Sequence, residues 1–369
     1  MASKQMLHMN QGQEETSYAR NSSAQSVEQN KMKPLIEAAI LDLCSRSSTM
    51  LPTRMVIADL GCSSGPNALT LVSIAVQAIH SHYLQFVQPP PEVWVLLNDL
   101  PHNDFNTVVQ SLVTLHKGND PVVVTGVAPG LFYERLFTSG SLHLVCSSNS
   151  LHWLSKAPGV LTSNKIPAYD IDEHARLERL PIVFEAYEQQ FRKDFTLFLK
   201  LRAKEQVPGG RMVISLPGRR SDQLASELCH LRETLARILR IMVIEGVIDK
   251  AKFESFYVPM HGPSDEDLRV IIQEEGSFFI GEMRVHDPRS GVDNALMVPS
   301  WFAIMMRAVF EPISVQHFGD VMDEFMACTE QRWSQPGSLE EEVAGNPLVM
   351  LVVSLTKVVL VEIYIGCLT

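Results

Sequence analysis

The feature that most constrains the fold is a series of short apolar runs separated by stretches with helical spacing. The runs are RMVIADL (54–60), EVWVLLNDL (92–100), PVVVTGV (121–127), SLHLVCSS (141–148) and GGRMVISL (209–216). Strands that alternate with helices predict parallel βαβ units, and therefore an α/β fold with a doubly wound sheet. Ligands of such sheets bind beyond the carboxyl ends of the strands. We therefore expect the functional residues just after each run.

The sequence outside these runs predicts that the whole chain has four parts, of which the sheet domain is one. Residues 1–30 are polar, and a helix is expected to begin near Pro34 and to run through LIEAAILDLC. A buried strand is expected near 348–355. We divide the chain into an N-terminal arm (1–30), a sheet domain (31–217), a largely helical cap (218–340) and a returning strand with an apolar tail (341–369).

The cap is predicted from helical periodicity. The segment SDQLASELCHLRETLARILRIMVIEG (221–246) has Ser221 as its expected N-cap and Gly246 beyond its end. One apolar stripe runs along it, formed by Leu224, Leu228, Leu231, Leu235, Ile238 and Met242. Further helices are expected at 264–275, 299–310 and 315–333.

Composition narrows the class of function. The net charge of -11 gives no basic surface for nucleic acid. The six cysteines are scattered, which is typical of free thiols in a reducing compartment, and the N-terminus lacks an apolar signal core, so we expect a cytoplasmic protein. Lys357 and Glu362 interrupt the apolar tail, which argues against a membrane span. A small-molecule substrate is the remaining expectation.

The stretch VIADLGCSSGPNAL (56–69) allows two interpretations. Gly61-Cys62-Ser63-Ser64-Gly65 fits the Gly-x-Ser-x-Gly of a serine hydrolase, with His261, His286 or His317 as the late base, but no oxyanion stretch precedes it. The same residues also fit a cofactor turn after a strand. A nicotinamide or flavin turn is disfavoured because Ser63 replaces its second glycine and Asp99 comes too late.

A turn for S-adenosylmethionine makes fewer demands because this methyl donor has no phosphates. It needs a tight turn, which Asp59, Gly61 and Gly65 can supply, and a carboxylate after the second strand for its ribose hydroxyls, which Asp99 can supply. The alternative is that both acids only cap helices. Together they favour a methyl donor.

Several segments in one order resemble the plant SABATH family of S-adenosylmethionine-dependent methyltransferases. This family includes salicylate, benzoate, jasmonate and indole-acetate carboxyl methyltransferases and xanthine N-methyltransferases. The resemblance covers about residues 5 to 355 and is carried by LHMNQGQEETSYARNS, IADLGCSSGPNAL, LNDLPHNDFN, GVAPGLFYERLF, SSNSLHWLSKAP, VPGGRMVISLPGRRS, EEGSFFI and MRAVFEPI.

The resemblance implies a Rossmann-like sheet with a helical cap, a homodimer, and an N-terminal segment folded over the site. It assigns cofactor contacts to Tyr18, Cys62, Asn67, Asp99, Leu100, Phe132 and Ser148. Gln25 and Trp153 would hold the acceptor carboxylate, and Asn149, His152, Met306 and Val309 would form the pocket wall together with Tyr18. A structural magnesium ion would be bound by Asn164, Glu254 and the carbonyl of Phe256, although Tyr257 stands where an asparagine is usual.

The chemistry agrees with a carboxyl methyltransferase. A carboxylic acid with a pKa of about 4 is ionised at neutral pH, so its oxygen attacks the sulfonium methyl group without a general base. The site must supply alignment and exclude water. His152 is therefore expected as pocket wall rather than as a base.

The acceptor stays open at this point. Acids of the salicylate, benzoate, jasmonate and indole-acetate types are candidates, and a xanthine ring nitrogen is the alternative. Arg232 stands where salicylate-type enzymes often have an aromatic pocket residue. Its guanidinium could bind a second acidic or carbonyl group of the acceptor, but we expect it to point to solvent from the edge of an amphipathic helix.

Overall fold

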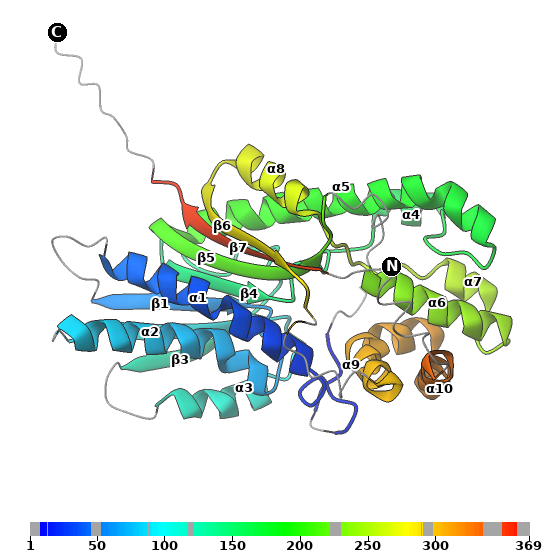
Figure 1. Cartoon of the computed structure of the whole chain (residues 1–369), viewed down its shortest axis with the longest axis horizontal. Coiled ribbons are helices and arrows are strands. Elements are labelled where there is room, and N and C mark those ends of the chain that lie inside the picture. The colour runs from blue at the N-terminus through cyan, green and yellow to red at the C-terminus, as the bar shows by residue number, and fades with distance from the viewer. Residues whose placement is uncertain are drawn as a thin grey trace, which may run out of the picture.

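The protein forms one mixed seven-stranded sheet with helices on its faces and a helical layer at one end (Figure 1). The computed structural model describes residues 8–12, 14–45, 53–86, 89–116, 122–221, 230–288, 290, 298–334 and 349–359. Among these residues, no helix has both the length and the apolar character needed to cross a membrane.

The sheet has the strand order β3-β2-β1-β4-β5-β7-β6. Its strands are β1 (Arg54–Leu60), β2 (Glu92–Asp99), β3 (Val123–Pro129), β4 (Leu142–Ser148), β5 (Gln206–Gly218), β6 (Phe278–His286) and β7 (Val349–Lys357). The first five run parallel, and β7 pairs antiparallel with both β5 and β6. The chain winds outward in both directions from β1 and β4, so a ligand-binding crevice is expected at the carboxyl ends of these two strands.

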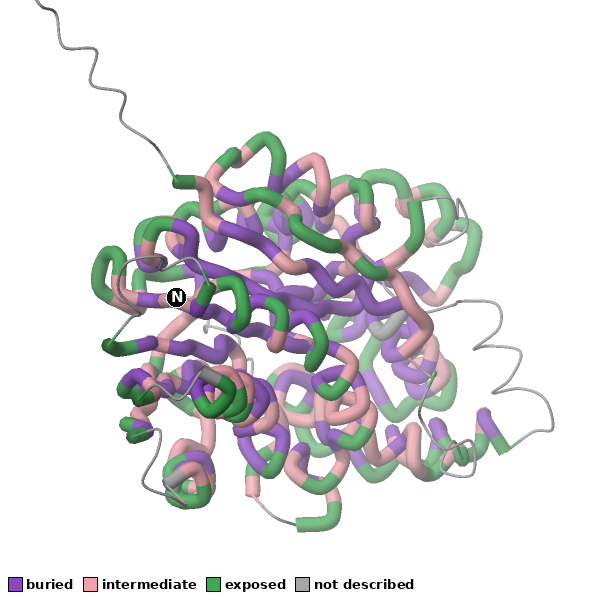
Figure 2. The backbone as a smooth tube through the Cα atoms, turned by 60° about the vertical axis from the view of Figure 1, so that its left-hand side comes forward, coloured by how far each residue is buried: buried purple, intermediate pink, exposed green. Residues whose placement is uncertain are grey.

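Helices cover most of both faces of the sheet. On one face α1 (Ser23–Ser45), α2 (Thr70–Phe86) and α3 (Phe105–Leu112) pack in front of the strands (Figure 1). On the other face α5 (Glu173–Glu205), preceded by the short α4 (Gly159–Asn164), runs behind β4 and β5 and contacts α8 (Asp265–Glu275). The strands between these layers are mostly buried (Figure 2), so the sheet forms the core.

The cap lies beyond the carboxyl ends of the parallel strands (Figure 1). It contains α6 (His230–Ile244), α7 (Lys250–Glu254), α9 (Pro299–Phe318) and α10 (Met322–Trp333). The predicted stripe of α6 is buried at Leu235, Ile238 and Met242. Leu224 and Leu228, also predicted for this stripe, lie within residues 222–229, which are outside the described residues. The predicted start at Ser221 directly precedes this range.

The prediction that the first helix begins near Pro34 is wrong. Helix α1 begins at Ser23 and carries Pro34 in its interior. Proline cannot donate the backbone hydrogen bond of that turn, which normally weakens a helix. Burial of Met32, Leu35 and Ile36 against the sheet core compensates for the missing bond.

The helix boundaries in the cap also differ from the prediction. We expected helices at 299–310 and 315–333, but α9 continues through Pro312 to Phe318. The helix ends at Gly319, whose φ of 94° is a conformation that glycine adopts readily. The following helix α10 then begins at Met322.

Residues 278–286 were expected within the helical cap but form the edge strand β6. This strand pairs with β7 along most of its length, with an irregularity between Ile280 and Glu282. Its exposed and buried positions do not alternate regularly, so periodicity alone gave no strand signal there. The prediction of a strand near 348–355 agrees with β7, which extends to Lys357, where the ammonium group donates to the carbonyl of Gln206 at 2.6 Å.

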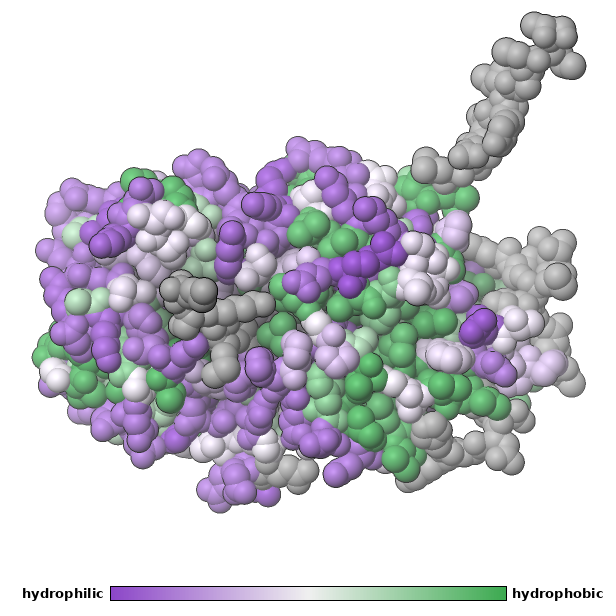
Figure 3. Space-filling view, turned by 180° about the vertical axis from the view of Figure 1, so that it is seen from behind, coloured by the Kyte–Doolittle hydropathy of each residue, from purple (hydrophilic) through white to green (hydrophobic). Residues whose placement is uncertain are grey.

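One part of the sheet is only partly covered. Within the described residues, no helix lies between β3 and β4, and β2 and β3 are only partly covered around Trp94 and Val124 on the face that carries α5. The side chains of Trp94 and Val124 on this face are each 36% exposed. Figure 3 shows apolar residues gathered on the side of the molecule that holds these strands. Parallel sheets are usually covered on both faces, and the described residues leave this part of the sheet partly uncovered.

Candidate functional site

The turn after β1 is held tightly against β2. The backbone N–H groups of Gly61 and Cys62 both donate to the carbonyl of Asn98 at 2.9 Å. Gly61 has a φ of 77°, and a Cβ atom placed there would lie 2.3 Å from the hydroxyl oxygen of Ser150. Glycine is therefore needed at this position both for its backbone conformation and for the close approach of the turn after β4.

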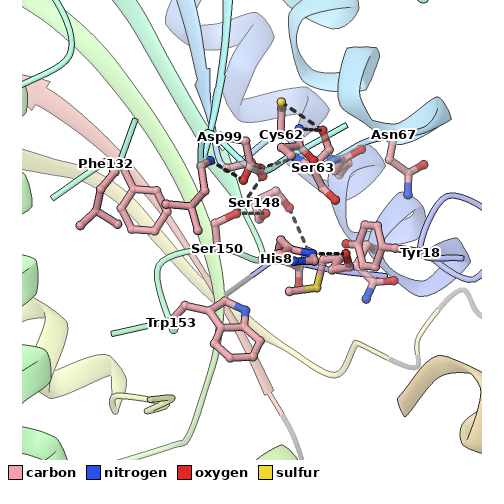
Figure 4. Close-up of a pocket in the computed structure, with 18 of the residues that line it drawn as sticks. His8, Tyr18, Cys62, Ser63, Asn67, Asp99, Phe132, Ser148, Ser150 and Trp153 are labelled. Atoms are coloured by element: carbon pink, nitrogen blue, oxygen red, sulfur yellow. Dashed lines mark hydrogen bonds between the residues drawn. The ribbon is translucent and has the colours of Figure 1, made fainter. Parts of the chain in front are cut away.

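Asp99, at the end of β2, is bonded directly to this turn. One carboxylate oxygen accepts the N–H of Ser63 at 2.6 Å and the other accepts the N–H of Leu100 at 2.7 Å (Figure 4). The side chain of Asn103 donates to the carbonyl of Ser63 at 2.8 Å, which fixes the turn from a second direction. The carboxylate is thus oriented beside the strand tip before any ligand is present.

Two acidic side chains give this end of the sheet its electrostatic character. Burial, and then the negative charge of Asp99, raise the pKa of Asp59 to about 8. Burial raises the pKa of Asp99 to about 6, although the N–H groups of Ser63 and Leu100 act in the opposite direction. Ionising these buried carboxyl groups is costly. A ligand with positive charge and hydrogen-bond donors would stabilise their ionised form.

The turn after β4 forms the opposite wall. The Ser148 hydroxyl is 3.0 Å from that of Ser215, and the Asn149 amide donates to Ser148 at 3.0 Å. Asn149 has a φ of 55°, which asparagine tolerates better than most residues. Ser150 donates its hydroxyl to the carbonyl of Gly61 at 3.0 Å, and this bond joins the two turns.

Trp153 is held at the end of this wall. Its backbone N–H donates to Ser150 at 3.0 Å, and its carbonyl accepts the hydroxyl of Tyr133 at 2.8 Å. The indole lies below the serines in Figure 4, and its ring centre is 6.0 Å from that of Phe310 on α9. Trp153 therefore stands between the sheet and the cap.

The N-terminal arm completes the pocket. The N–H of Tyr18 donates to Asn10, and the N–H of Asn10 donates to Ala308 on α9, both at 2.9 Å. A Cβ atom on Gly65 would lie 2.6 Å from that of Ala19, so the turn and the arm touch closely. These arm residues therefore connect α9 to the turn after β1.

The pocket brings together most of the predicted site residues. Those in its lining are Tyr18, Gln25, Gly61, Cys62, Asn67, Asp99, Leu100, Phe132, Ser148, Asn149 and Trp153. Four of the residues predicted for the cofactor and acceptor sites lie outside the lining. Asp59 and His152 are buried behind it, Met306 is in the core, and Val309 packs partly buried against that core.

The pocket also contains residues that sequence reasoning did not assign to it. They are His8, Met9, Gln29, Ser63, Asn103, Leu131, Tyr133, Ser150 and Leu154. Most of them lie within the segments that carry the family resemblance, so the signal was present but did not distinguish lining from support. Gln29 is one helical turn after Gln25 on α1, and its position depended on the early start of that helix.

Arg232 does not point to solvent, so that expectation is wrong. Its side chain is 1% exposed, and its guanidinium carbon lies 3.8 Å from the centre of the Tyr187 ring. Nη1 donates to the carbonyl of Met260 at 3.3 Å. The aromatic face and the buried carbonyl offset the cost of removing this cation from water.

The magnesium site assigned to Asn164, Glu254 and Phe256 stays a prediction, and two of these residues make other contacts. The Asn164 amide donates to Val160 within its own helix at 2.8 Å, and the Glu254 carboxylate is 3.5 Å from the Lys250 ammonium. The Tyr257 hydroxyl donates to Ile166 at 3.0 Å. Across the described ranges, no three His, Cys, Asp or Glu side chains are grouped as a metal ion would require. We derive no step through magnesium.

The hydrolase interpretation has none of its three proposed late bases in the pocket. Of the three late histidines, His286 is 2.7 Å from Glu28, and His317 is 2.8 Å from the carbonyl of Lys252. His261 is buried beside Phe191. None of the three is in the pocket lining, where Ser63 lies.

Comparisons with known proteins agree with the geometry. A family model described as SAM dependent carboxyl methyltransferase matches residues 4–358. The chain is 39% identical over 383 residues to "Probable jasmonic acid carboxyl methyltransferase 2" of Theobroma cacao, covering 96% of this chain and 98% of that protein. It is 39% identical over 331 residues to "Salicylate carboxymethyltransferase" of Clarkia breweri, covering 87% of this chain and 90% of that protein. The solved structure "Loganic acid methyltransferase with SAH" matches with a TM-score of 0.80 at 27% identity, covering 95% of this chain and 98% of that one.

Proposed function

The chain belongs to the family of SAM-dependent carboxyl methyltransferases and is an enzyme of that class, and we propose that it methylates a small carboxylic acid held by Gln25 and Trp153. The observation that carries this proposal is the position of the Asp99 carboxylate. It lies beside a glycine turn, in one pocket with an amide and an indole. These are the groups that a cationic nucleoside donor and an anionic acceptor require.

Four of the lining residues fit the methyl donor. Bound S-adenosylmethionine supplies a sulfonium methyl group. The second lone pairs of the Asp99 oxygens are available for ribose hydroxyls, because each oxygen accepts one backbone hydrogen bond from the described residues. Tyr18 and Phe132 present aromatic rings to the pocket, which tolerate a positive charge. Ser148 adds a hydroxyl at the tip of β4.

The acceptor side of the pocket needs no catalytic base. Burial lowers the pKa of His152 to about 3, so this imidazole is neutral at physiological pH. Gln25 and Trp153 bring neutral N–H donors, which can orient a carboxylate without neutralising its attacking oxygen. Their contribution is alignment of the anion with the methyl group and exclusion of water.

The proposal is tested with the purified chain, donor labelled in its methyl group, and a panel of small acids and xanthines. We expect labelled methyl esters, which mild alkali cleaves to release labelled methanol. A label that resists alkali would identify N-methylation, and binding of an acid without transfer would identify a binding protein. Ser63→Ala should leave transfer intact, because Ser63 contacts Asp99 through its backbone N–H; a serine hydrolase would lose activity.

Trp153→Phe is expected to lower kcat about tenfold, because one hydrogen bond to the acceptor, of about 1.4 kcal/mol, is lost. The ring stays aromatic, so packing against Phe310 should survive. Donor affinity, measured by calorimetry, should change less than twofold. Trp301→Phe is the matched control, since Trp301 lies outside the pocket lining and packs on Phe302. Equal kcat values for both variants would remove Trp153 from the reaction.

We propose that the enzyme is a homodimer that covers this partly uncovered part of the sheet. The support is the exposure of Trp94 and Val124 on parallel strands that are only partly covered, together with the apolar surface in Figure 3. A second copy of this face would bury the same apolar side chains in a symmetric contact.

Trp94→Glu is expected to convert the dimer to a monomer, because it places a charge in the proposed contact. Light scattering after gel filtration at micromolar concentration measures the change. Leu84→Glu is the control, because Leu84 is also apolar and is 65% exposed, but lies on α2. A Trp94→Glu protein that stays dimeric would place the contact elsewhere.

We also propose a cytoplasmic location. The support is that Cys44, Cys62, Cys146 and Cys328 are all buried free thiols. A fluorescent fusion seen in an oxidising compartment would contradict it.

A further inference from the structure

Trp153, the proposed anchor of the acceptor carboxylate, lies in a segment without regular secondary structure. Residues 149–158 connect β4 to α4 and contain no helix or strand, apart from a single bridge between Trp153 and Met260. A side chain that aligns two reactants has to be held to within about 0.5 Å of the productive geometry. This precision must therefore come from the contacts that other segments make with this one.

The backbone of Trp153 and of the residue after it is fixed by three hydrogen bonds. The N–H of Trp153 donates to the carbonyl of Ser150 at 3.0 Å, and its own carbonyl accepts the hydroxyl of Tyr133 at 2.8 Å. The N–H of Leu154 donates to the carbonyl of Pro259 at 2.8 Å. Of these three bonds, only the one from Tyr133 involves a side chain. It is therefore the bond that a single substitution can remove without changing the backbone.

A buried carboxylate on α5 anchors the same segment. Asp194 accepts the N–H and the hydroxyl of Ser155, both at 2.8 Å, and the side-chain amide of Gln190 at 2.9 Å. These bonds offset the cost of burying the carboxylate. Burial, and then the negative charge of Asp194, raise the pKa of Tyr133 well above its usual value. The tyrosine therefore keeps its proton and stays a hydrogen-bond donor.

Tyr133 is itself held from the same helix. Arg202 of α5 is fully buried, and its guanidinium donates to the carbonyl of Phe132 at 3.1 Å and to that of Glu134 at 3.0 Å. These two carbonyls flank Tyr133 in the chain. The buried carboxylate of Glu205 lies 2.7 Å from Arg202 and balances its charge. One continuous helix thus fixes both Tyr133 and the segment that accepts its hydrogen bond.

We propose that Tyr133 is a positioning residue for methyl transfer: its hydroxyl, held from α5 through Arg202, fixes Trp153 so that the indole N–H aligns the acceptor carboxylate. The inference rests on the proposed function, because the effect of Tyr133 on the reaction passes through Trp153. The hydroxyl proton is already directed to the Trp153 carbonyl, so it makes no bond to the acceptor. Its loss changes the alignment of the acceptor, and not the binding of the donor.

A double-mutant cycle tests this inference with the best acid of the panel. Tyr133→Phe removes only the hydroxyl and should lower kcat at least fivefold, while donor affinity, measured by calorimetry, stays within twofold. In the Trp153→Phe protein, the same substitution should lower kcat less than twofold, because the N–H that it positions is already absent. Equal fold losses in the two backgrounds would overturn the inference, since a direct contact or a general loss of stability acts independently of Trp153.

Tyr257→Phe is the matched control. The Tyr257 hydroxyl also donates to a backbone carbonyl, that of Ile166 at 3.0 Å, but Tyr257 is outside the pocket lining. Both tyrosine variants should lower Tm by a similar amount, and Tyr257→Phe should keep kcat within twofold of the wild-type value. A loss of kcat as large as that in Tyr133→Phe would overturn the inference. So would an unchanged kcat in Trp153→Phe, whereas a wild-type enzyme that methylates no acid of the panel would overturn the proposed function itself.

Discussion

Replacing Gly61 by alanine is expected to abolish donor binding and to destabilise the fold by about 3 kcal/mol, from a strained backbone and an overpacked contact. Gly61 has a φ of 77°, and the new Cβ would lie 2.3 Å from the Ser150 hydroxyl oxygen and 2.5 Å from its Cβ. The bond between Ser150 and the Gly61 carbonyl would have to open, which moves the turns of β1 and β4 apart. Calorimetry with the demethylated donor and chemical denaturation measure the two effects.

Two further variants separate the contributions of backbone strain and steric clash to this loss of stability. Gly140→Ala is the control for backbone strain alone, since Gly140 has a φ of 61° and nothing lies within 4 Å of the new Cβ. Ser150→Gly combined with Gly61→Ala removes the steric clash but keeps the strain, and should regain part of the stability. Wild-type donor affinity in Gly61→Ala would show that this turn is not the cofactor turn.

Asp99→Asn is expected to weaken donor binding by about 10- to 100-fold, because hydrogen bonds to a charged carboxylate contribute about 1.5–3 kcal/mol each. The amide also places an NH₂ group opposite the backbone N–H of Ser63 or Leu100, both of which the carboxylate now accepts. The turn therefore loses one of its fixed bonds as well. Calorimetric affinity for the donor, and for its demethylated product, measures the change.

Asp104→Asn is the matched control for this substitution. Asp104 is five residues further on, caps α3 by accepting the N–H of Thr107 at 3.1 Å, and is not in the pocket lining. We expect a small loss of stability and unchanged donor affinity in this variant. If the two variants bound the donor equally well, Asp99 would have no part in the site.

The strands of the parallel sheet could be predicted because each is a compact apolar run. Asp99 and the Gly61 turn were found in this way, since parallel strands bring their carboxyl ends to one edge. Strand β6 was missed because it lies at the edge of the sheet, where an irregularity at Ile280 breaks the alternation. Local periodicity carries no information about such long-range pairing.

The errors around the site have a common physical origin. Helix α1 was expected to begin near Pro34, because the polar residues before it give no amphipathic signal, and Gln29 was missed as a result. Arg232 was placed in solvent because a guanidinium is seldom fully buried. Its burial depends on Tyr187, 45 positions earlier in the chain, and on a carbonyl of Met260, neither of which helical spacing reveals.

The arm has a kinetic consequence. Three of its contacts, Asn10 with Ala308, Ala19 with Gly65 and Ser22 with Asn67, fasten it across the pocket. The demethylated donor, bound beneath the arm, can leave only when these contacts break. We therefore infer that product release, and not the chemical step, limits the turnover rate. A rapid first turnover equal to the enzyme concentration, followed by a slower steady phase, would be its signature. A linear time course from the first milliseconds would refute it.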